Sequence, residues 1–291
     1  AIGAPGVDIG GHGESAGAAF VFFGGRTGEV STREADTQYQ GEAAGDYAVS
    51  QVASAGDIDG DGRTEIAVAA EYASNPVDAA GVVYIVSPGT LGTFPLAGAD
   101  VRLHGATSHE RAGHSLQSSA DLNDDGSPDL LVGAPYFVDE ETGGRVGRVY
   151  IVFGGSELVD GGLWDAGFTI DGTTPDAFVG FAIATPGDLN EDGHSDLVVS
   201  SMNADSAGVD AGAVYVLFGP FDADRTVEEA DHTIYGEYPG DMTGHALANA
   251  GDFNRDGRMD LLIGSNGNDY GDNNAGAAYI LFAPIDESAD L

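Results

Sequence analysis

The sequence Asp57-Ile-Asp-Gly-Asp-Gly-Arg-Thr-Glu65 has three related copies further along the chain. These copies begin at Asp121, Asp188 and Asp252, and each repeats the same order of oxygen-bearing side chains and glycine. Their starts are separated by 64, 67 and 64 residues. A repeat of nearly fixed length predicts one architecture built from stacked units.

Short apolar runs recur at the same places in each unit. One run follows the acidic loop, at residues 66–70, 130–134, 197–201 and 261–264, and a second lies at 82–86, 149–153, 214–218 and 278–282. A weaker run closes the unit at 101–105, 168–172 and 233–236, and a fourth leads into the next acidic loop, as at 114–120 and 181–186. Short β-branched or aromatic runs bounded by Gly, Pro, Asn and Asp are typical of strands in tight succession.

Four strands per unit predict an all-β fold, a β-propeller of four-stranded blades. We expect about five blades, in units of roughly 1–45, 46–110, 111–177, 178–241 and 242–291, forming a single propeller domain or the greater part of one. The register starts at a second strand and stops after a third, so the terminal blades are expected to be incomplete. Natural β proteins cover or pair exposed edges. We therefore expect a longer propeller, or strand exchange with another copy.

The acidic loops have the ligand pattern of a calcium site. Side-chain oxygens recur at the first, third, fifth and ninth positions, glycine stands at the sixth, and a backbone carbonyl is available at the seventh. Ca²⁺ takes six to eight oxygen ligands on such tightly turned loops. We predict about four Ca²⁺ ions, held by Asp57, Asp59, Asp61, Arg63 and Glu65; Asp121, Asn123, Asp125, Ser127 and Asp129; Asp188, Asn190, Asp192, His194 and Asp196; and Asp252, Asn254, Asp256, Arg258 and Asp260.

Two other interpretations of the loops were weighed. One isolated copy could be a Gly-Asp turn on an acidic surface, but four copies in register argue against this. An EF-hand needs a Glu at the twelfth position and a following helix. Here the twelfth residues are Val68, Val132, Val199 and Ile263, within apolar β-branched runs.

Composition narrows the functional classes. The chain has 291 residues with 48 Asp and Glu against ten Arg and no Lys, a formal net charge of −38. Such a charge excludes ordinary binding to nucleic acid or anionic membranes, and it suits salt-rich or calcium-rich surroundings. The absence of Cys excludes disulfides, zinc-thiolate sites and a thiol nucleophile. No apolar run approaches the roughly 20 residues of a membrane span.

The units resemble the FG-GAP repeats of integrin α-subunit β-propellers and their prokaryotic relatives. Leu131-Val-Gly-Ala-Pro135 and Gly3-Ala4-Pro5 carry the Gly-Ala-Pro element. The Phe-Gly element has drifted to Ala112-Gly113, Val179-Gly180 and Thr243-Gly244, and Val49 stands at the glycine position before the first loop. The resemblance implies calcium in the acidic loops and partners on the opposite face.

We therefore predict a non-catalytic, extracellular or cell-surface recognition or adhesion module. It would bind a protein or glycan ligand, and self-association through the terminal blades is a further expectation. The candidate ligand loops are 6–15, 71–79, 136–145, 203–210 and 266–274, with 106–111, 173–177 and 237–242 between blades.

Three alternatives stay open: a propeller of a secreted enzyme, a lectin, and a structural subunit. For an enzyme, Gly13-Glu-Ser-Ala-Gly17 fits a hydrolase elbow, but that elbow needs a helix after it and an apolar strand-like run follows here. For a lectin, Tyr72, Tyr136 and Tyr270 are only a partial set of sugar-stacking rings.

Overall fold

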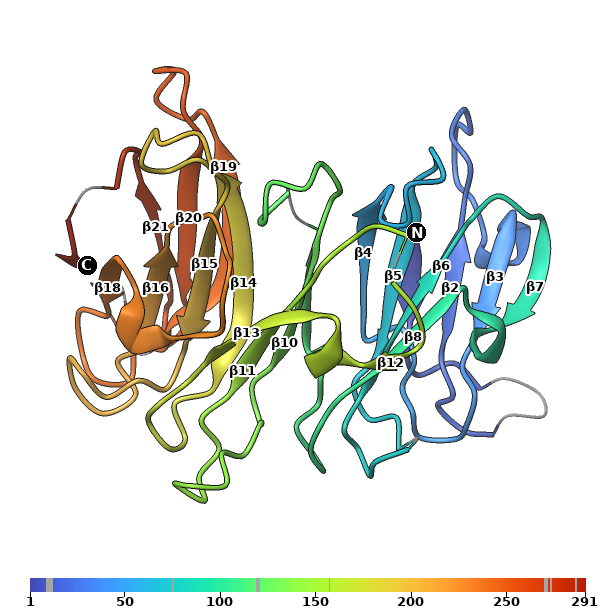
Figure 1. Ribbon diagram of the computed structural model, residues 1–291, viewed down its shortest axis with the longest axis horizontal. Coiled ribbons are helices and arrows are strands. Elements are labelled where there is room, and N and C mark those ends of the chain that lie inside the picture. The colour runs from blue at the N-terminus through green and yellow to red at the C-terminus, as the bar shows by residue number, and fades with distance from the viewer. Residues whose placement is uncertain are drawn as a thin grey trace.

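The fold is all-β, as the sequence predicts. The computed structural model describes residues 1–8, 13–74, 76–118, 121–156, 158–269, 272, 274–285 and 287–291. Within these residues the strands form five sheets. The sheets follow one another in chain order from one end of the molecule to the other, as blades of a propeller do (Figure 1).

Three units form complete blades of four antiparallel strands. In the first of these, β4 (Gln51–Gly56), β5 (Glu65–Ala70), β6 (Val82–Val86) and β8 (Val101–His104) pair in that order. The next blade contains β9 (Ser115–Ser118), β10 (Leu130–Ala134), β11 (Arg148–Val152) and β13 (Gly167–Asp171). The third contains β14 (Val179–Gly187), β15 (Asp196–Ser201), β16 (Ala213–Leu217) and β18 (His232–Tyr235).

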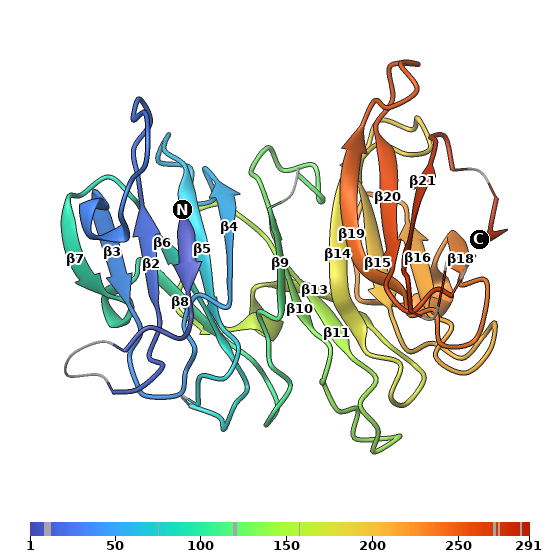
Figure 2. The ribbon, with the colours of Figure 1, turned by 180° about the vertical axis from the view of Figure 1, so that it is seen from behind.

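The terminal blades are incomplete, as expected from the register of the repeats. The first sheet holds β1 (Ile2–Ala4), β2 (Ala18–Val21) and β3 (Thr37–Gln40), which correspond to second, third and fourth strands. The last holds β19 (Thr243–Gly251), β20 (Asp260–Ser265) and β21 (Ala277–Leu281), which correspond to first, second and third strands. Figure 2 places these two sheets at opposite ends of the molecule.

Four short strands that the sequence patterns did not predict extend the outer edges of the sheets. They are β7 (Gly92–Pro95), β12 (Gly161–Gly162), β17 (Arg225–Thr226) and β22 (Ala289–Asp290). Each pairs in parallel with the fourth strand of the preceding blade, namely β3, β8, β13 and β18. Each of the first four blades is therefore joined to a strand of the following unit.

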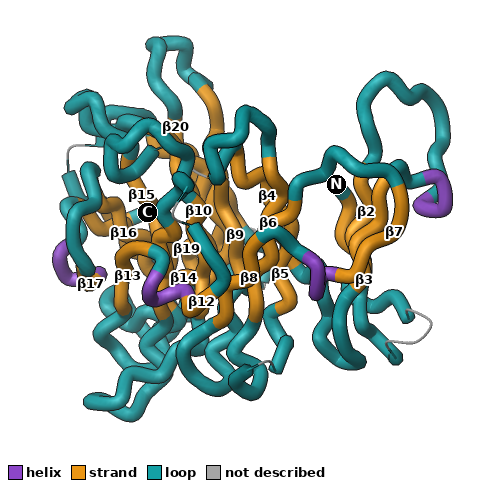
Figure 3. Tube along the Cα trace, turned by 45° about the vertical axis from the view of Figure 1, so that its right-hand side comes forward, coloured by secondary structure: helices purple, strands orange, loops and turns teal. Residues whose placement is uncertain are grey.

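The short helices sit at this same outer margin. Each is a single 3₁₀ turn: η1 (Thr32–Glu34) precedes β3, whereas η2 (Leu96–Gly98), η3 (Leu163–Asp165) and η4 (Val227–Glu229) follow β7, β12 and β17. Figure 3 shows them at the periphery of a body made of strands and loops.

The core lies between adjacent blades. In the three complete blades the second and third strands are almost entirely buried, so β6 and β10 read as continuous apolar runs and not as alternating ones. Val83 and Ile85 of β6 pack with Leu130 and Val132 of β10 in one cluster. Because each blade buries its faces against its neighbours, no blade is expected to be stable alone.

Tyrosines of the third strands take part in these contacts between blades. Tyr84 and Tyr150 are buried. The hydroxyl of Tyr84 donates to Glu42 at 2.9 Å, and that of Tyr150 donates to Glu110 at 2.8 Å. Glu42 and Glu110 follow the fourth strands of the preceding blades, so each tyrosine joins two units.

The strand order separates two kinds of loop. Each acidic loop joins the first and second strands of a blade, as between β4 and β5. In an antiparallel sheet, the loops from second to third strand and from one blade to the next must lie at the other end. Figure 1 shows the acidic loops along the upper edge and the loop between β10 and β11 at the lower edge.

Candidate functional site

Each acidic loop is curled by its own carboxylates. The carboxylate of the first residue accepts the backbone N–H of the sixth, and that of the fifth residue accepts the N–H of the seventh. For the glycine at position six, the N···O distances are 3.0 Å at Gly62, 2.7 Å at Gly126, 2.9 Å at Gly193 and 3.0 Å at Gly257. The bonds to the seventh residues are 2.8–3.0 Å long. All four loops therefore share one hydrogen-bond pattern.

Two positions in each loop have a left-handed backbone. The sixth-position glycines have φ between 88° and 95°, which an L side chain adopts only with strain. The fourth residue is left-handed as well, with φ of 75° at Gly60, 60° at Asp124, 63° at Glu191 and 65° at Arg255. These turns bring the first, third and fifth side chains to the inside of the loop.

In the first loop the carboxylates form a compact cluster. One oxygen from each of Asp57, Asp59 and Asp61 lies within 4.8 Å of the others, a grouping that could hold a metal ion. In the other loops the third residue is Asn, and its amide donates to the fifth-position carboxylate at 2.8–2.9 Å. The side chains at the third and fifth positions, predicted as ligands of one ion, therefore lie together in every loop.

The ninth residue distinguishes the first loop from the rest. Glu65 is fully buried, and among the described residues its carboxylate lacks the pair of backbone hydrogen bonds that the other loops show, although the backbone N–H of Ile58 favours its charged form. Asp129 is equally buried but accepts backbone N–H groups from Leu122 at 2.7 Å and Gly154 at 3.1 Å. Asp196 and Asp260 are held in the same way. The sequence patterns did not predict the hydrogen bonds from backbone N–H groups in the segment after the third strand.

The buried carboxylates are electrostatically unfavourable as they stand. Burial raises the pKa of Glu65, and the nearby charges of Asp59 and Asp61 raise it further. Burial also raises the pKa of Asp129 and of Asp196 to about 6, although backbone N–H groups act in the opposite direction. A cation among these oxygens would offset both desolvation and mutual repulsion.

The exposed carboxylates at the fifth position behave differently. Backbone N–H groups of Ser127 and His194, followed by the neighbouring Asn amides, lower the pKa of Asp125 and Asp192 respectively. These groups are therefore anionic over the whole physiological pH range. The donor set is made of hard oxygen atoms, which fits Ca²⁺.

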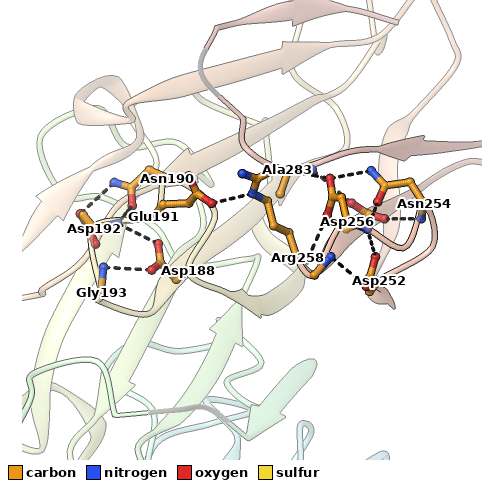
Figure 4. Close-up of polar contacts among 12 residues, drawn as sticks. Asp188, Asn190, Glu191, Asp192, Gly193, Asp252, Asn254, Asp256, Arg258 and Ala283 are labelled. Atoms are coloured by element: carbon orange, nitrogen blue, oxygen red, sulfur yellow. Dashed lines mark hydrogen bonds and ion pairs between the residues drawn. The ribbon is translucent and has the colours of Figure 1, made fainter.

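Side chains at the seventh position connect neighbouring loops. The imidazole of His194 lies 2.6 Å from the carboxylate of Asp124, the fourth residue of the preceding loop. Arg258 makes the equivalent contact with Glu191 at 2.7 Å (Figure 4). The side chains of His194 and Arg258 thus contact the adjacent loop, and use of the four seventh-position carbonyls as ligands stays a prediction. The sequence does contain a signal for this contact. An acidic residue stands at position four of one loop, and a basic residue stands at position seven of the next loop.

Comparison with known proteins identifies the repeat. Residues 48–86, 112–152, 180–217 and 243–281 match the FG-GAP repeat, and together they make up more than half of the chain. The chain belongs to the FG-GAP repeat family. Each matched segment runs from the start of a blade, through its acidic loop, to the end of the third strand.

Several integrin α subunits are similar to this FG-GAP chain. Human integrin alpha-7 is 36% identical over 173 residues, which cover 57% of this chain and 13% of the integrin. Integrin alpha-PS2 of Drosophila melanogaster is 29% identical over 222 residues, which cover 74% of this chain and 15% of that subunit. Mouse integrin alpha-IIb is 31% identical over 170 residues, which cover 57% of this chain and 16% of that subunit. The match thus spans about one seventh of the length of these subunits.

Proposed function

We propose that this FG-GAP chain is a calcium-stabilised recognition module without catalytic activity. The proposal is supported by the four acidic loops, which share two backbone hydrogen bonds to their carboxylates, and by the carboxylate cluster in the first of them. In each loop the side chains at positions one, three, five and nine, with the carbonyl at position seven, would hold one Ca²⁺. The bound ion would supply positive charge where buried carboxylates now repel one another. The first loop fits this role because oxygens of Asp57, Asp59 and Asp61 lie within 4.8 Å of one another and the buried Glu65 has a raised pKa beside them.

The partner would bind on the face opposite the calcium loops. That face combines the loops between second and third strands with those between blades. Such loops can vary without disturbing the sheets, so they are free to carry recognition. The similarity to integrin α subunits supports an adhesion role at the cell surface or outside the cell, and the acidic surface supports a salt-rich or calcium-rich setting. Among the described residues no helix is both long and apolar enough to cross a membrane.

The non-catalytic assignment is supported at the hydrolase-like sequence around Ser15. The strand β2 begins at Ala18, directly after this sequence, where a nucleophile elbow would continue into a helix. A secreted enzyme and a lectin stay as alternatives. Hydrolysis of ester or glycoside substrates by the purified chain would favour the enzyme.

The proposed function is tested by two paired measurements with and without a calcium chelator. Thermal melting should show a large loss of stability on chelation, because each site at a hundredfold excess over its Kd adds roughly 2.7 kcal/mol to the folded state. Binding to an array of glycans and matrix proteins should occur in calcium and disappear with chelator. A melt unchanged by chelation, together with an array that retains nothing in calcium, contradicts the proposal.

A structural subunit is the remaining candidate. Among the described strands, β1 and β21 each pair with one neighbour only, β2 and β20. Unpaired strand edges are templates for another strand. We propose that these edges can associate with further strands, including those of a second copy. Sedimentation should then reveal larger species as the protein concentration rises, whereas a constant monomeric mass at every concentration contradicts it.

A further inference from the structure

Arg111 is held between two tyrosine rings on the face opposite the acidic loops. Its guanidinium carbon lies 4.6 Å from the ring centre of Tyr72 and 4.5 Å from that of Tyr136. Tyr72 follows β5, Tyr136 follows β10, and Arg111 lies in the connection from β8 to β9. Three loops from two adjacent blades therefore meet at this cation.

The charge of Arg111 has no anionic partner. Among the described residues its guanidinium makes neither a hydrogen bond nor an ion pair, although the chain carries 48 acidic residues. Arg145 is unpaired in the same sense and lies 5.9 Å from the ring centre of Tyr136. By contrast, Arg26, Arg102, Arg148 and Arg258 form ion pairs with carboxylates. The ring of Tyr136 therefore lies near two guanidinium groups, those of Arg111 and Arg145, that form no ion pair among the described residues.

Three acidic residues near this cation have other partners. Glu71 contacts His114 at 2.9 Å. Glu110 is fully buried and accepts hydrogen bonds from the backbone of Ala106 and Thr107 and from the Tyr150 hydroxyl. Asp139, in the loop that also carries Tyr136, accepts the N–H of Thr142 at 3.0 Å. These carboxylates do not neutralise the guanidinium groups.

Aromatic rings continue on both sides of the Arg111 sandwich. Tyr47 lies 5.4 Å from Tyr72, and Phe178 lies 5.2 Å from Tyr136. Tyr47, Arg111, Phe178 and Met242 occupy one position in four successive units, each with a left-handed φ of 48–60°, so this backbone belongs to the repeat itself. We call Tyr47, Tyr72, Arg111, Tyr136, Arg145 and Phe178 the ring row.

The ring row has the chemistry of a site for a planar anion. The contacts of Arg111 with Tyr72 and Tyr136 are to ring faces, and among the described residues its N–H groups have no hydrogen-bond partner. Those N–H groups match the two oxygens of a carboxylate. The half-exposed rings on either side are suited to the C–H faces of sugars, and Tyr47 is the most open, at 42% exposure.

We propose that the ring row binds the carboxylate of an acidic sugar in a polysaccharide chain, with Arg111 as the principal anion ligand and Arg145 as a second. This inference rests on the recognition role proposed above and names its ligand class. A sugar is favoured over an acidic peptide because rings flank the guanidinium groups along a row that crosses three units.

The test uses three small probes at saturating calcium. They are a trisaccharide of galacturonic acid, its methyl ester, which keeps the shape but lacks the charge, and a tri-aspartate peptide, which keeps the charge but lacks the sugar. Short probes avoid gel formation with calcium. Only the free trisaccharide should bind measurably by calorimetry or by changes in NMR spectra.

Substitutions locate the site. Arg111→Gln should weaken trisaccharide binding about tenfold or more, since hydrogen bonds to charged groups are the strong ones. Arg145→Gln, at an exposed side chain that holds no partner, should give a smaller loss. Arg33→Gln, which removes an equally unpaired charge at the outer turn η1, should change binding less than twofold. If Arg111→Gln does not fold, Arg145→Gln still decides.

Each other outcome overturns the inference. Equal binding of the methyl ester excludes the carboxylate, equal binding of tri-aspartate excludes the sugar, and unchanged binding by the Arg111 and Arg145 variants excludes the ring row. No binding of any probe by a protein whose melt depends on calcium overturns this inference alone. A melt independent of calcium would instead contradict the proposed function.

Discussion

Glu65 is a buried carboxylate in the first acidic loop. A buried carboxylate without a hydrogen-bond donor is costly unless a cation or proton accompanies it. The backbone N–H of Ile58 favours the charged form of Glu65, but burial and the charges of Asp59 and Asp61 outweigh it and raise the pKa. The proposed calcium ion would supply the missing positive charge.

Replacing Glu65 by Gln should have opposite effects under the two conditions. In chelator, Glu65→Gln should raise the free energy of unfolding by about 1 kcal/mol, because an unpaired buried charge disappears. In calcium, the variant should gain less stability than the parent, since the first loop loses a ligand. Thermal melting of both proteins, with and without chelator, measures this reversal.

The equivalent change in the second loop provides the control. Asp129→Asn should lower stability in chelator by about 1–2 kcal/mol, because its amide would face one of the two N–H groups that Asp129 now accepts. If both substitutions shift the chelated protein in the same direction, the distinction drawn between the two loops is wrong.

The grouping of acidic side chains inside the first loop follows from local spacing, whereas their role as calcium ligands stays a prediction. Positions one, three, five and nine are encoded by local spacing, and the structure gathers Asp57, Asp59 and Asp61 accordingly. The N–H groups of Gly154, Gly219 and Ala283 that bind the ninth carboxylates come from the segment after the third strand. No local pattern marks a backbone donor that arrives from a different strand.

Close approach between adjacent blades depends on a glycine directly before the third strand of the blade. Gly81 has φ of 87°, and an added Cβ would overlap the backbone of Ala112 in the next blade. Gly17, Gly147 and Gly212 occupy the same position and meet Ala48, Val179 and Thr243. The repeat of this contact sets the spacing of the blades.

Gly81→Ala should therefore destabilise the protein by about 2–4 kcal/mol, through backbone strain and the clash with Ala112 together. Gly25→Ala isolates the first cause, because Gly25 has φ of 91° with nothing within 4 Å of an added Cβ. That control should cost about 1 kcal/mol or less. Equal losses in the two variants, measured by denaturant unfolding, would show that the contact between blades contributes nothing.

The antiparallel strands were predictable because each carries an apolar run, and the predicted runs differ from the observed strands by only a residue or two at most ends. The edge strands β7, β12, β17 and β22 were not. Gly161–Gly162 and Arg225–Thr226 are two residues long and have no alternating pattern, since they pair through backbone groups at an outer edge. Their position depends on the preceding blade, which local sequence does not describe.

Tyr270, named with Tyr72 and Tyr136 in the partial ring set, lies outside the described residues.

For the whole molecule, the net charge of −38 is the dominant unfavourable feature. Four Ca²⁺ ions would offset eight of these charges and leave a strongly acidic surface. Salt eases the remaining repulsion, because the Debye length falls from about 10 Å at 0.1 M to about 3 Å at 1 M.

With calcium held at saturation, the melting temperature should rise between 0.1 M and 1 M NaCl, by about 2–4 °C for each 1 kcal/mol regained. Differential scanning calorimetry at several salt concentrations checks this. A steady fall in melting temperature with added NaCl would argue against adaptation to a salt-rich environment.

Calcium binding by each of the four repeated loops can be measured by calorimetric titration of the calcium-stripped protein, which counts the bound ions. We expect about four equivalents of Ca²⁺ per chain, falling to about three when Asp125 in the second loop is replaced by Ala. Absence of saturable calcium uptake, or an unchanged count in Asp125→Ala, would contradict it.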